Sequence, residues 1–207
     1  GISFTIIDQS GSAPEGINVY NFVDVSNYVV NEGDSIMVRG TVGQYNGLTQ
    51  IVPDSIMLIS SGSILPAHTL VTALDETTES QLIRMENLTV TNVPSGSSKN
   101  IDVFDGTNTF TMRVDADTDI LDSLSINVDD KICSLYGVGG QFDNSSPYTS
   151  GYQIFPMRYT DIILNKNNSS SIVINVTACN NYTWLQNNIT YTTGGAYVDT
   201  MQSSLGC

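Results

Sequence analysis

The chain has 207 residues, of which 40% are hydrophobic and 14% are charged. This hydrophobic fraction is sufficient for packed cores, so the composition excludes an intrinsically disordered chain. Seven Lys and Arg residues against 21 Asp and Glu residues give a net charge of -14, and the cations are scattered singly. Because nucleic acids and anionic membrane surfaces are bound by clustered cations, we expect no nucleic-acid binding. The sequence has no run of about eighteen apolar residues, so we expect no membrane insertion.

Residues 33–51 predict a strongly bent β-hairpin. Apolar side chains alternate along its first half, and Gly40 and Gly43 interrupt the alternation at a bend. The dipeptide Asn46-Gly47 tolerates the positive φ of a tight turn. A looser copy follows at residues 129–156, since the sequences VRGTVGQYNGLTQIVP and LYGVGGQFDN…GYQIFP share one order of glycines, Gln, aromatic, turn, Gln-Ile and Pro. The chain therefore looks like two versions of one β unit followed by a tail.

Short apolar runs separated by Gly-rich turns and two polar linkers predict an all-β chain of tandem domains. The expected domains are residues 1–62, residues 65–165 and residues 171–207. Besides the central hairpin, strands are expected at residues 2–6, 17–22, 55–59, 83–91, 101–104, 109–114, 132–136 and 152–155, with one short helix at residues 77–82. Residues 159–164 are expected to close the second domain.

An acidic stretch provides the candidate ion site. Alternate carboxylates of this kind gather oxygen ligands around Ca²⁺. The stretch lacks the glycine and the final acidic residue of an EF-hand loop, so a solvated acidic loop is the alternative. The candidate ligands of calcium, which is the single expected cofactor, are Asp115, Asp117, Asp119 and Asp122.

The three cysteines are Cys133, Cys179 and Cys207. Cys133 lies in an apolar run, where a buried free thiol is expected. Cys179 and Cys207 bracket the tail, where a disulfide between them would close a small extracellular module. The alternative for Cys207 is a cross-link to a neighbouring molecule.

No catalytic motif is present, and the single histidine, His68, is interpreted as a packing or linker residue. The sequence therefore predicts that the chain is not an enzyme. Tyr45 at the hairpin tip and Tyr148 in a later loop are the candidates for stacking on a ligand. Aromatic packing within the sheets is the alternative for both.

Two parts of the sequence carry a family resemblance. The first part resembles the tandem OB-fold-like domains of large secreted and cell-surface proteins of Bacteroidota. The first domain of such a tandem is similar to FTIIDQSGSAPEGINVYNF followed by VNEGDSIMVRGTVGQYNGLTQIVP. The second domain is similar to LIRMENLTVTN followed by YGVGGQFDNSSPYTSGYQIFPMRYTDI. The tail ACNNYTWLQNNITYTTGGAYVDTMQSSLGC is similar to short repeats of gliding and adhesion proteins exported by type IX secretion. The resemblance implies two tandem OB-like β-barrels followed by a short β-sandwich-like repeat.

The resemblance also implies that a full first barrel has another strand before Gly1 and that the tail repeat continues beyond Cys207. Either a longer polypeptide or neighbouring copies would then supply these strands. O-glycosylation in that phylum occurs at Asp followed by Ser or Thr and an apolar residue, although the same pattern also occurs where polar residues begin a strand. The four matching sites are Ser35, Ser55, Ser123 and Thr200.

Together these features favour a non-catalytic extracellular or cell-surface adhesion module, with other copies or neighbouring domains as partners and surface glycans as further candidates. Strand sharing between copies would build a filament. The alternative is an accessory carbohydrate- or nucleic-acid-binding domain of a secreted hydrolase or nuclease, in which the acidic charge favours carbohydrate.

Overall fold

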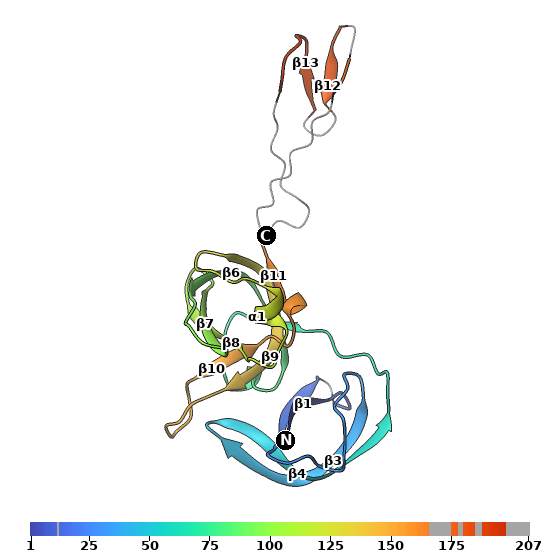
Figure 1. Cartoon of the computed structure of the whole chain (residues 1–207), viewed down its shortest axis with the longest axis vertical. Helices are drawn as coiled ribbons and strands as arrows, with labels where there is room; N and C mark the ends of the chain where they lie inside the picture. Colours follow the sequence, from blue (N-terminus) through green and yellow to red (C-terminus); the bar gives the residue numbers. More distant parts are fainter. Residues whose placement is uncertain (12, 166–174, 178–179, 185–187, 198–207) are drawn as a thin grey trace. The chain divides into compact units, whose positions relative to one another are not determined.

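The computed structural model describes residues 1–11, 13–165, 175–177, 180–184 and 188–197. The chain divides into two compact units, residues 1–164 and residues 165–207. Strands are by far the commonest regular structure among the described residues, with only short helical turns beside them, which confirms the all-β class (Figure 1). No helix among them has the length and hydropathy needed to cross a membrane.

The first sheet contains four strands in the order β1-β2-β4-β3. Strands β2 and β4 are parallel, whereas the other neighbours are antiparallel. The long hairpin of β3 and β4 turns at Asn46 and Gly47, whose φ values of 48° and 91° explain why this dipeptide is used there. The strands are β1 (Ile2–Asp8), β2 (Glu15–Asn21), β3 (Ser35–Tyr45) and β4 (Leu48–Ser60).

The second sheet closes into a five-stranded barrel, which Figure 1 shows as a ring. Its order is β6-β7-β8-β10-β9, and β9 pairs back with β6. Strands β8 and β10 are parallel, so the barrel has the Greek-key character of OB-like folds. The five strands are β6 (Leu82–Asn92), β7 (Lys99–Phe104), β8 (Thr109–Val114), β9 (Lys131–Gln141) and β10 (Tyr152–Phe155).

The two copies of the β unit that the sequence predicts pair their strands in the same register. Gly43 pairs with Gln50 in the first sheet, and Gly140 pairs with Gln153 in the barrel. The parallel pairs agree as well, because Val19 lies opposite Ile51 as Met112 lies opposite Ile154. Strands β1, β2, β4 and β3 therefore correspond to β7, β8, β10 and β9.

Short elements complete the described fold. The expected helix at residues 77–82 is wrong, because only a 3₁₀ turn, η1 (Glu76–Thr78), forms before β6 begins at Leu82. Asp75 caps this turn by accepting a hydrogen bond from the Thr77 backbone N–H. The remaining elements are β5 (Thr69–Leu70), α1 (Ile120–Ser123), η2 (Tyr159–Asp161) and β11 (Ile162–Leu164).

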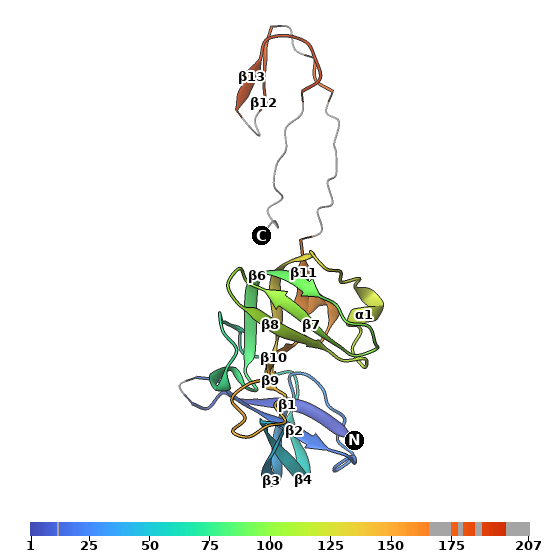
Figure 2. The same ribbon diagram turned by 90° about the vertical axis from the view of Figure 1, so that its left-hand side faces the viewer.

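The described part of the C-terminal unit contains one short antiparallel hairpin, β12 (Tyr182–Trp184) and β13 (Ile189–Tyr191) (Figure 2). Thr183 and Thr190 lie opposite each other, with their hydroxyl oxygens 2.9 Å apart. Among the described residues of this unit, this hairpin is the β structure that can be compared with the expected β-sandwich-like repeat.

Candidate functional site

The first sheet has two strands with an unpaired edge among the described residues, β1 and β3. In the barrel, the corresponding strands β7 and β9 both pair with β6. The first sheet thus reproduces four strands of the barrel and, within the described ranges, lacks a partner in the position of β6. An edge of this kind presents a row of backbone N–H and C=O groups that can accept another strand.

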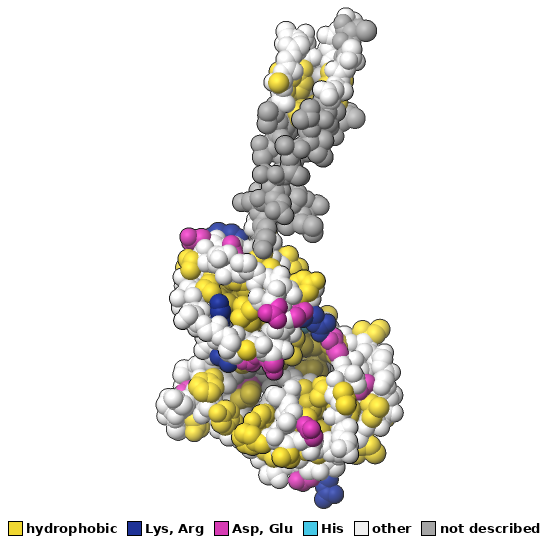
Figure 3. All heavy atoms as spheres, in the orientation of Figure 1, with side chains coloured by type: hydrophobic (Ala, Val, Ile, Leu, Met, Phe, Trp, Pro, Cys, Tyr) yellow, Lys and Arg dark blue, Asp and Glu magenta, His cyan; other side chains and the backbone are white. Residues whose placement is uncertain are grey.

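Side-chain burial shows what β6 contributes to the barrel. Leu135 on β9 and Ile154 on β10 are completely buried. Their counterparts in the first sheet, Val38 and Ile51, are only half-buried. Val42 on β3 is 64% exposed, and hydrophobic side chains lie uncovered over the first sheet (Figure 3). The open sheet therefore leaves apolar surface in water that the closed barrel buries.

The core of the first sheet is correspondingly small. Its buried cluster consists of Ile2, Val25 and Ile56, with Phe4 and Tyr28 packed against it. Val25 and Tyr28 come from the loop after β2, so this loop covers only one part of the sheet. A strand between β1 and β3 would enlarge this core.

The tips of the two corresponding hairpins contact each other within the first unit. The Asp143 backbone N–H donates to the carbonyl of Asn46 over 2.7 Å, and the Tyr45 and Phe142 rings meet edge to face at 6.4 Å. The Thr49 backbone N–H donates to Oε1 of Glu79 over 2.9 Å. These contacts occupy the hairpin tip and do not involve the outer edges of β1 and β3.

Two carboxyl groups near these contacts have shifted pKa values. Burial raises the pKa of Glu79, and its Oε2 has no hydrogen-bond partner among the described residues. Asp143 differs because the hydroxyl of Ser150 and the backbone N–H of Ser145 lower its pKa to about 2. The two groups therefore respond to pH in opposite directions.

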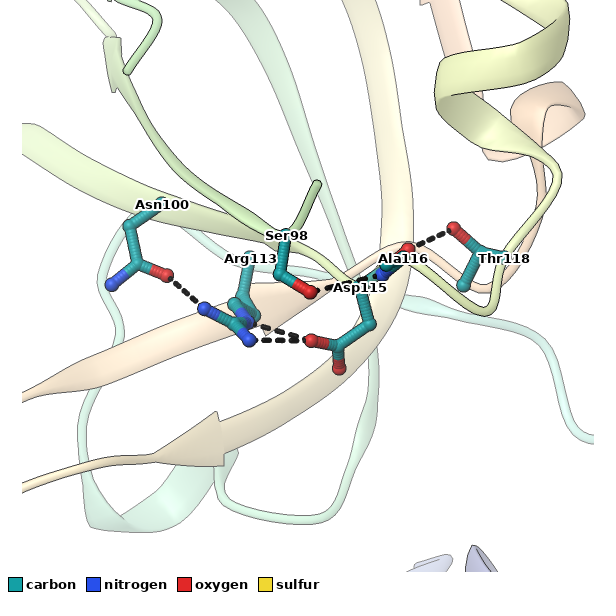
Figure 4. Close-up of polar contacts among 6 residues, drawn as sticks. All are labelled: Ser98, Asn100, Arg113, Asp115, Ala116 and Thr118. Carbon is teal, nitrogen blue, oxygen red and sulfur yellow. Dashed lines mark hydrogen bonds and ion pairs between the residues drawn. The ribbon is translucent and has the colours of Figure 1, made fainter. Parts of the chain in front are cut away.

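The candidate calcium ligands do not converge. Asp115 is paired with Arg113, whose Nη2 lies 2.6 Å from the Asp115 carboxylate and whose Nη1 donates to Asn100 (Figure 4). Asp119 accepts a hydrogen bond from the Tyr159 backbone N–H. In the described part of the chain, no group of three or more His, Cys, Asp or Glu side chains is arranged to hold a metal ion. Asp117 and Asp122 do not join the other two in a cluster, and calcium binding stays a prediction.

The other predicted residues are placed as follows. Tyr45 is exposed on β3, whereas Tyr148 is half-buried and its carbonyl accepts a hydrogen bond from Gln141. His68 packs edge-on against Tyr136 at 5.2 Å, as a packing residue would.

The candidate glycosylation sites in the described residues have different environments. Ser55 in β4 and Ser123 at the end of α1 are exposed, whereas Ser35 at the start of β3 is half-buried. Thr200 lies outside the described residues, so its environment is not described.

The expectation of a free thiol at Cys133 is wrong. Cys133 is half-buried on β9 and takes part in a disulfide. Its alternating position in an apolar run suggested a core residue, but sequence alternation does not distinguish a core thiol from a bonded one. The predicted Cys179–Cys207 pair lies outside the described residues.

Sequence reasoning did not single out Arg39. Arg39 is the only Lys or Arg among residues 1–62, and it lies exposed on β3. None of the ion pairs among the described residues includes it. A count of charges within the first domain would have singled it out.

A second surface feature lies beside the start of β1. An open hollow of about 810 Å³ is lined by residues that include Tyr20, Phe22 and Tyr28 together with Asn21 and Asp24. The Tyr20 and Phe22 rings meet edge to face at 5.1 Å, and Phe22 is 84% exposed. Aromatic faces beside amide and carboxylate groups provide the contacts that carbohydrates use.

In comparisons with family models, curated proteins and solved structures, the chain matches none of them.

Proposed function

We propose that the chain is a non-catalytic structural module of an extracellular or cell-surface assembly, and that it joins polypeptides by accepting a β-strand. One observation carries the proposal. Among the described residues, the first sheet has the strand order and register of the closed barrel but no strand in the position of β6. A strand added there would pair with β1 and β3 and bury the apolar surface between them.

The disulfide at Cys133 supports the extracellular location, since disulfides persist in oxidising compartments. The acidic composition, with single scattered cations, speaks against nucleic acid as the partner. Strand sharing between copies would produce a filament, as the hypothesis of an adhesion module assembled from copies of this chain requires.

The test uses a variant that supplies the strand within the same chain. In the barrel, Lys99 opens β7 as Ile2 opens β1, and residues 82–97 provide β6 and most of its connection. Placing a copy of residues 82–97 directly before Gly1 therefore reproduces the spacing of the barrel. We expect the wild-type chain to associate in sedimentation velocity and electron microscopy, and the extended variant to remain a monomer.

We also expect the extended variant to melt roughly 5 °C or more above the wild-type chain, because its first sheet closes. The matched control carries Ile83→Ser and Met85→Ser within the added copy only. These changes remove the side chains that β6 buries in the barrel and leave chain length unchanged. A wild-type chain that stays monomeric, or an extension that neither stabilises the chain nor prevents association, would contradict the proposal.

A second candidate function is carbohydrate binding at the hollow beside β1, which the exposed ring of Phe22 favours. A glycan array probed with the wild-type chain and with Phe22→Ala tests it. Binding that Phe22→Ala abolishes would support the accessory-domain alternative, and the absence of binding would remove it.

A further inference from the structure

The barrel indicates how a strand would lie on the open edge. Its β6 runs antiparallel to both β7 and β9, with residues 82–89 along β9 and residues 89–92 along β7. Transferred through the matching registers, an incoming strand would run antiparallel to both β3 and β1. It would begin beside β3 and finish beside β1.

The inward positions of this strand follow from β6. Ile83 and Met85 face Gly137 and Leu135 and are about 1% exposed. Gly40 and Val38 occupy the corresponding positions of β3. A strand residue opposite Gly40, and another opposite Val38, would therefore point into the open core and need apolar side chains.

The residue of β6 between Ile83 and Met85 is Arg84, which points out of the barrel and carries a positive charge. In the barrel, Arg84 on β6 lies directly opposite Tyr136 on β9, and its guanidinium lies 5.9 Å from the centre of the tyrosine ring. Arg39 takes the place of Tyr136 on β3. The barrel therefore pairs its cation with an aromatic ring across the two strands, whereas the first sheet presents the cation itself at the unpaired edge.

We propose that the partner of the open edge is an extended polypeptide strand that places an acidic residue opposite Arg39, between two inward apolar residues opposite Gly40 and Val38. This inference rests on the proposed function and adds the direction, register and charge of the strand. Arg39 is the only Lys or Arg of residues 1–62, so an acidic residue in any other position of the strand would find no cationic side chain on this sheet. The ion pair thereby selects the register, which backbone hydrogen bonds alone leave free to slip by two residues.

The experiment uses labelled peptides with the sequence of residues 82–92. One peptide keeps Arg84, a second carries Arg84→Glu, and a third carries Arg84→Glu with Ile83→Ser and Met85→Ser. Fluorescence anisotropy measures their dissociation constants for the wild-type chain and for Arg39→Glu. Arg39 is exposed on β3, so Arg39→Glu is expected to fold.

We expect the Arg84→Glu peptide to bind the wild-type chain at least roughly threefold more tightly than the peptide that keeps Arg84, since cross-strand opposite charges attract and like charges repel. The order should reverse with Arg39→Glu, and both differences should shrink at 1 M salt. The third peptide should bind at least roughly tenfold more weakly than the second, because it lacks the two inward apolar groups.

The outcomes separate the two proposals. If no peptide binds the wild-type chain, strand acceptance itself is overturned. If the peptides bind but the first and second peptides do not differ in affinity, or their order is unchanged by Arg39→Glu, the register inference is overturned while strand acceptance stands. Binding that persists in the variant extended by residues 82–97 would place the peptides elsewhere and overturn both.

Discussion

At the scale of single residues, Asp143 fixes the loop between β9 and β10. Its two carboxylate oxygens accept hydrogen bonds from the hydroxyl groups of Ser150 and Ser145, over 2.7 and 2.8 Å, and these bonds favour the charged form. The pKa of Asp143 falls from 3.8 to about 2. Its stabilising contribution is therefore complete above about pH 4 and is lost as the pH falls through 2.

We expect Asp143→Asn to lower the melting temperature at pH 6 and to flatten the decline of stability between pH 4 and pH 2. Ser150→Ala removes the largest single cause of the pKa shift and should give an intermediate slope. Thermal melts from pH 2 to pH 6 measure both effects. If the melting temperature of Asp143→Asn fell between pH 4 and pH 2 as steeply as that of the wild type, the Asp143 carboxyl would not be the cause of the acid destabilisation.

Glu79 has the opposite pH dependence. Its residue is only 9% exposed, and burial raises its pKa above 4.5 even though the Thr49 N–H stabilises the charged form. A raised carboxyl pKa gives a contribution that is complete below 4.5 and is lost as the pH rises through the folded-state value. Glu79→Gln should therefore stabilise the chain at pH 7 relative to the wild type.

The Gln side chain keeps an oxygen to accept from Thr49 and carries no charge to bury. Denaturant melts at pH 4.5 and pH 7 should show the difference between variant and wild type growing with pH. A difference that is constant across this range would assign Glu79 a packing role only.

At the scale of elements, corresponding strands of the two sheets provide matched positions. Ile154 on β10 is fully buried in the closed barrel, whereas its counterpart Ile51 on β4 is half-buried in the open sheet. Ile154→Ala should cost about 2–5 kcal/mol of unfolding free energy. Ile51→Ala should cost roughly 1–2 kcal/mol, because water already reaches this side chain.

Guanidinium unfolding of the two variants measures the difference. In the chain extended by residues 82–97, the cost of Ile51→Ala should rise toward that of Ile154→Ala, since the added strand covers Ile51. Equal costs in the unextended chain would mean that the first sheet is already closed in solution.

The same comparison explains what the sequence predicted about these elements. The order of glycines, Gln, turn and Gln-Ile was sufficient to identify the internal copy, because Gly40 lies at a register shift where a Cβ would meet the Val52 carbonyl and the Asn46-Gly47 turn has positive φ values. The all-β class followed from the same patterns. Glycines and turn residues therefore recur in the sequence at the positions where the two units share a bend or a turn.

The residues that sequence reasoning misplaced depend on side-chain and backbone partners that residue spacing alone does not identify. The spacing of Asp115 within its acidic run did not reveal that Arg113 holds its carboxylate, or that Asn100 on β7 lies opposite Arg113. The expected helix failed because the Ser80 backbone N–H donates to the Gly139 carbonyl and the Gly139 N–H donates to the Gln81 carbonyl, so contact with β9 begins before Leu82. Pairing between strands, which a local pattern does not contain, decided the second case and places Asn100 beside Arg113 in the first.

At the scale of the whole molecule, the net charge of -14 opposes association between copies. Strand addition would bring two such chains together, so screening of the charge should favour it. We expect the wild-type chain to associate more strongly as NaCl rises from 10 mM to 500 mM, where the Debye length falls from about 30 Å to roughly 4 Å. Sedimentation velocity at fixed protein concentration measures this dependence.

The same experiment tests the predicted calcium site. CaCl₂ and NaCl at equal ionic strength should act alike if screening alone operates, because Asp115 is engaged by Arg113 and, in the described part of the chain, the other three aspartates do not join it in a cluster. An excess effect of CaCl₂ that a chelator reverses, and that Asp117→Asn with Asp119→Asn abolishes, would establish ion binding by the acidic stretch. Association that weakens with added NaCl would contradict the proposed assembly through apolar strand burial, since screening then removes an attraction rather than a repulsion.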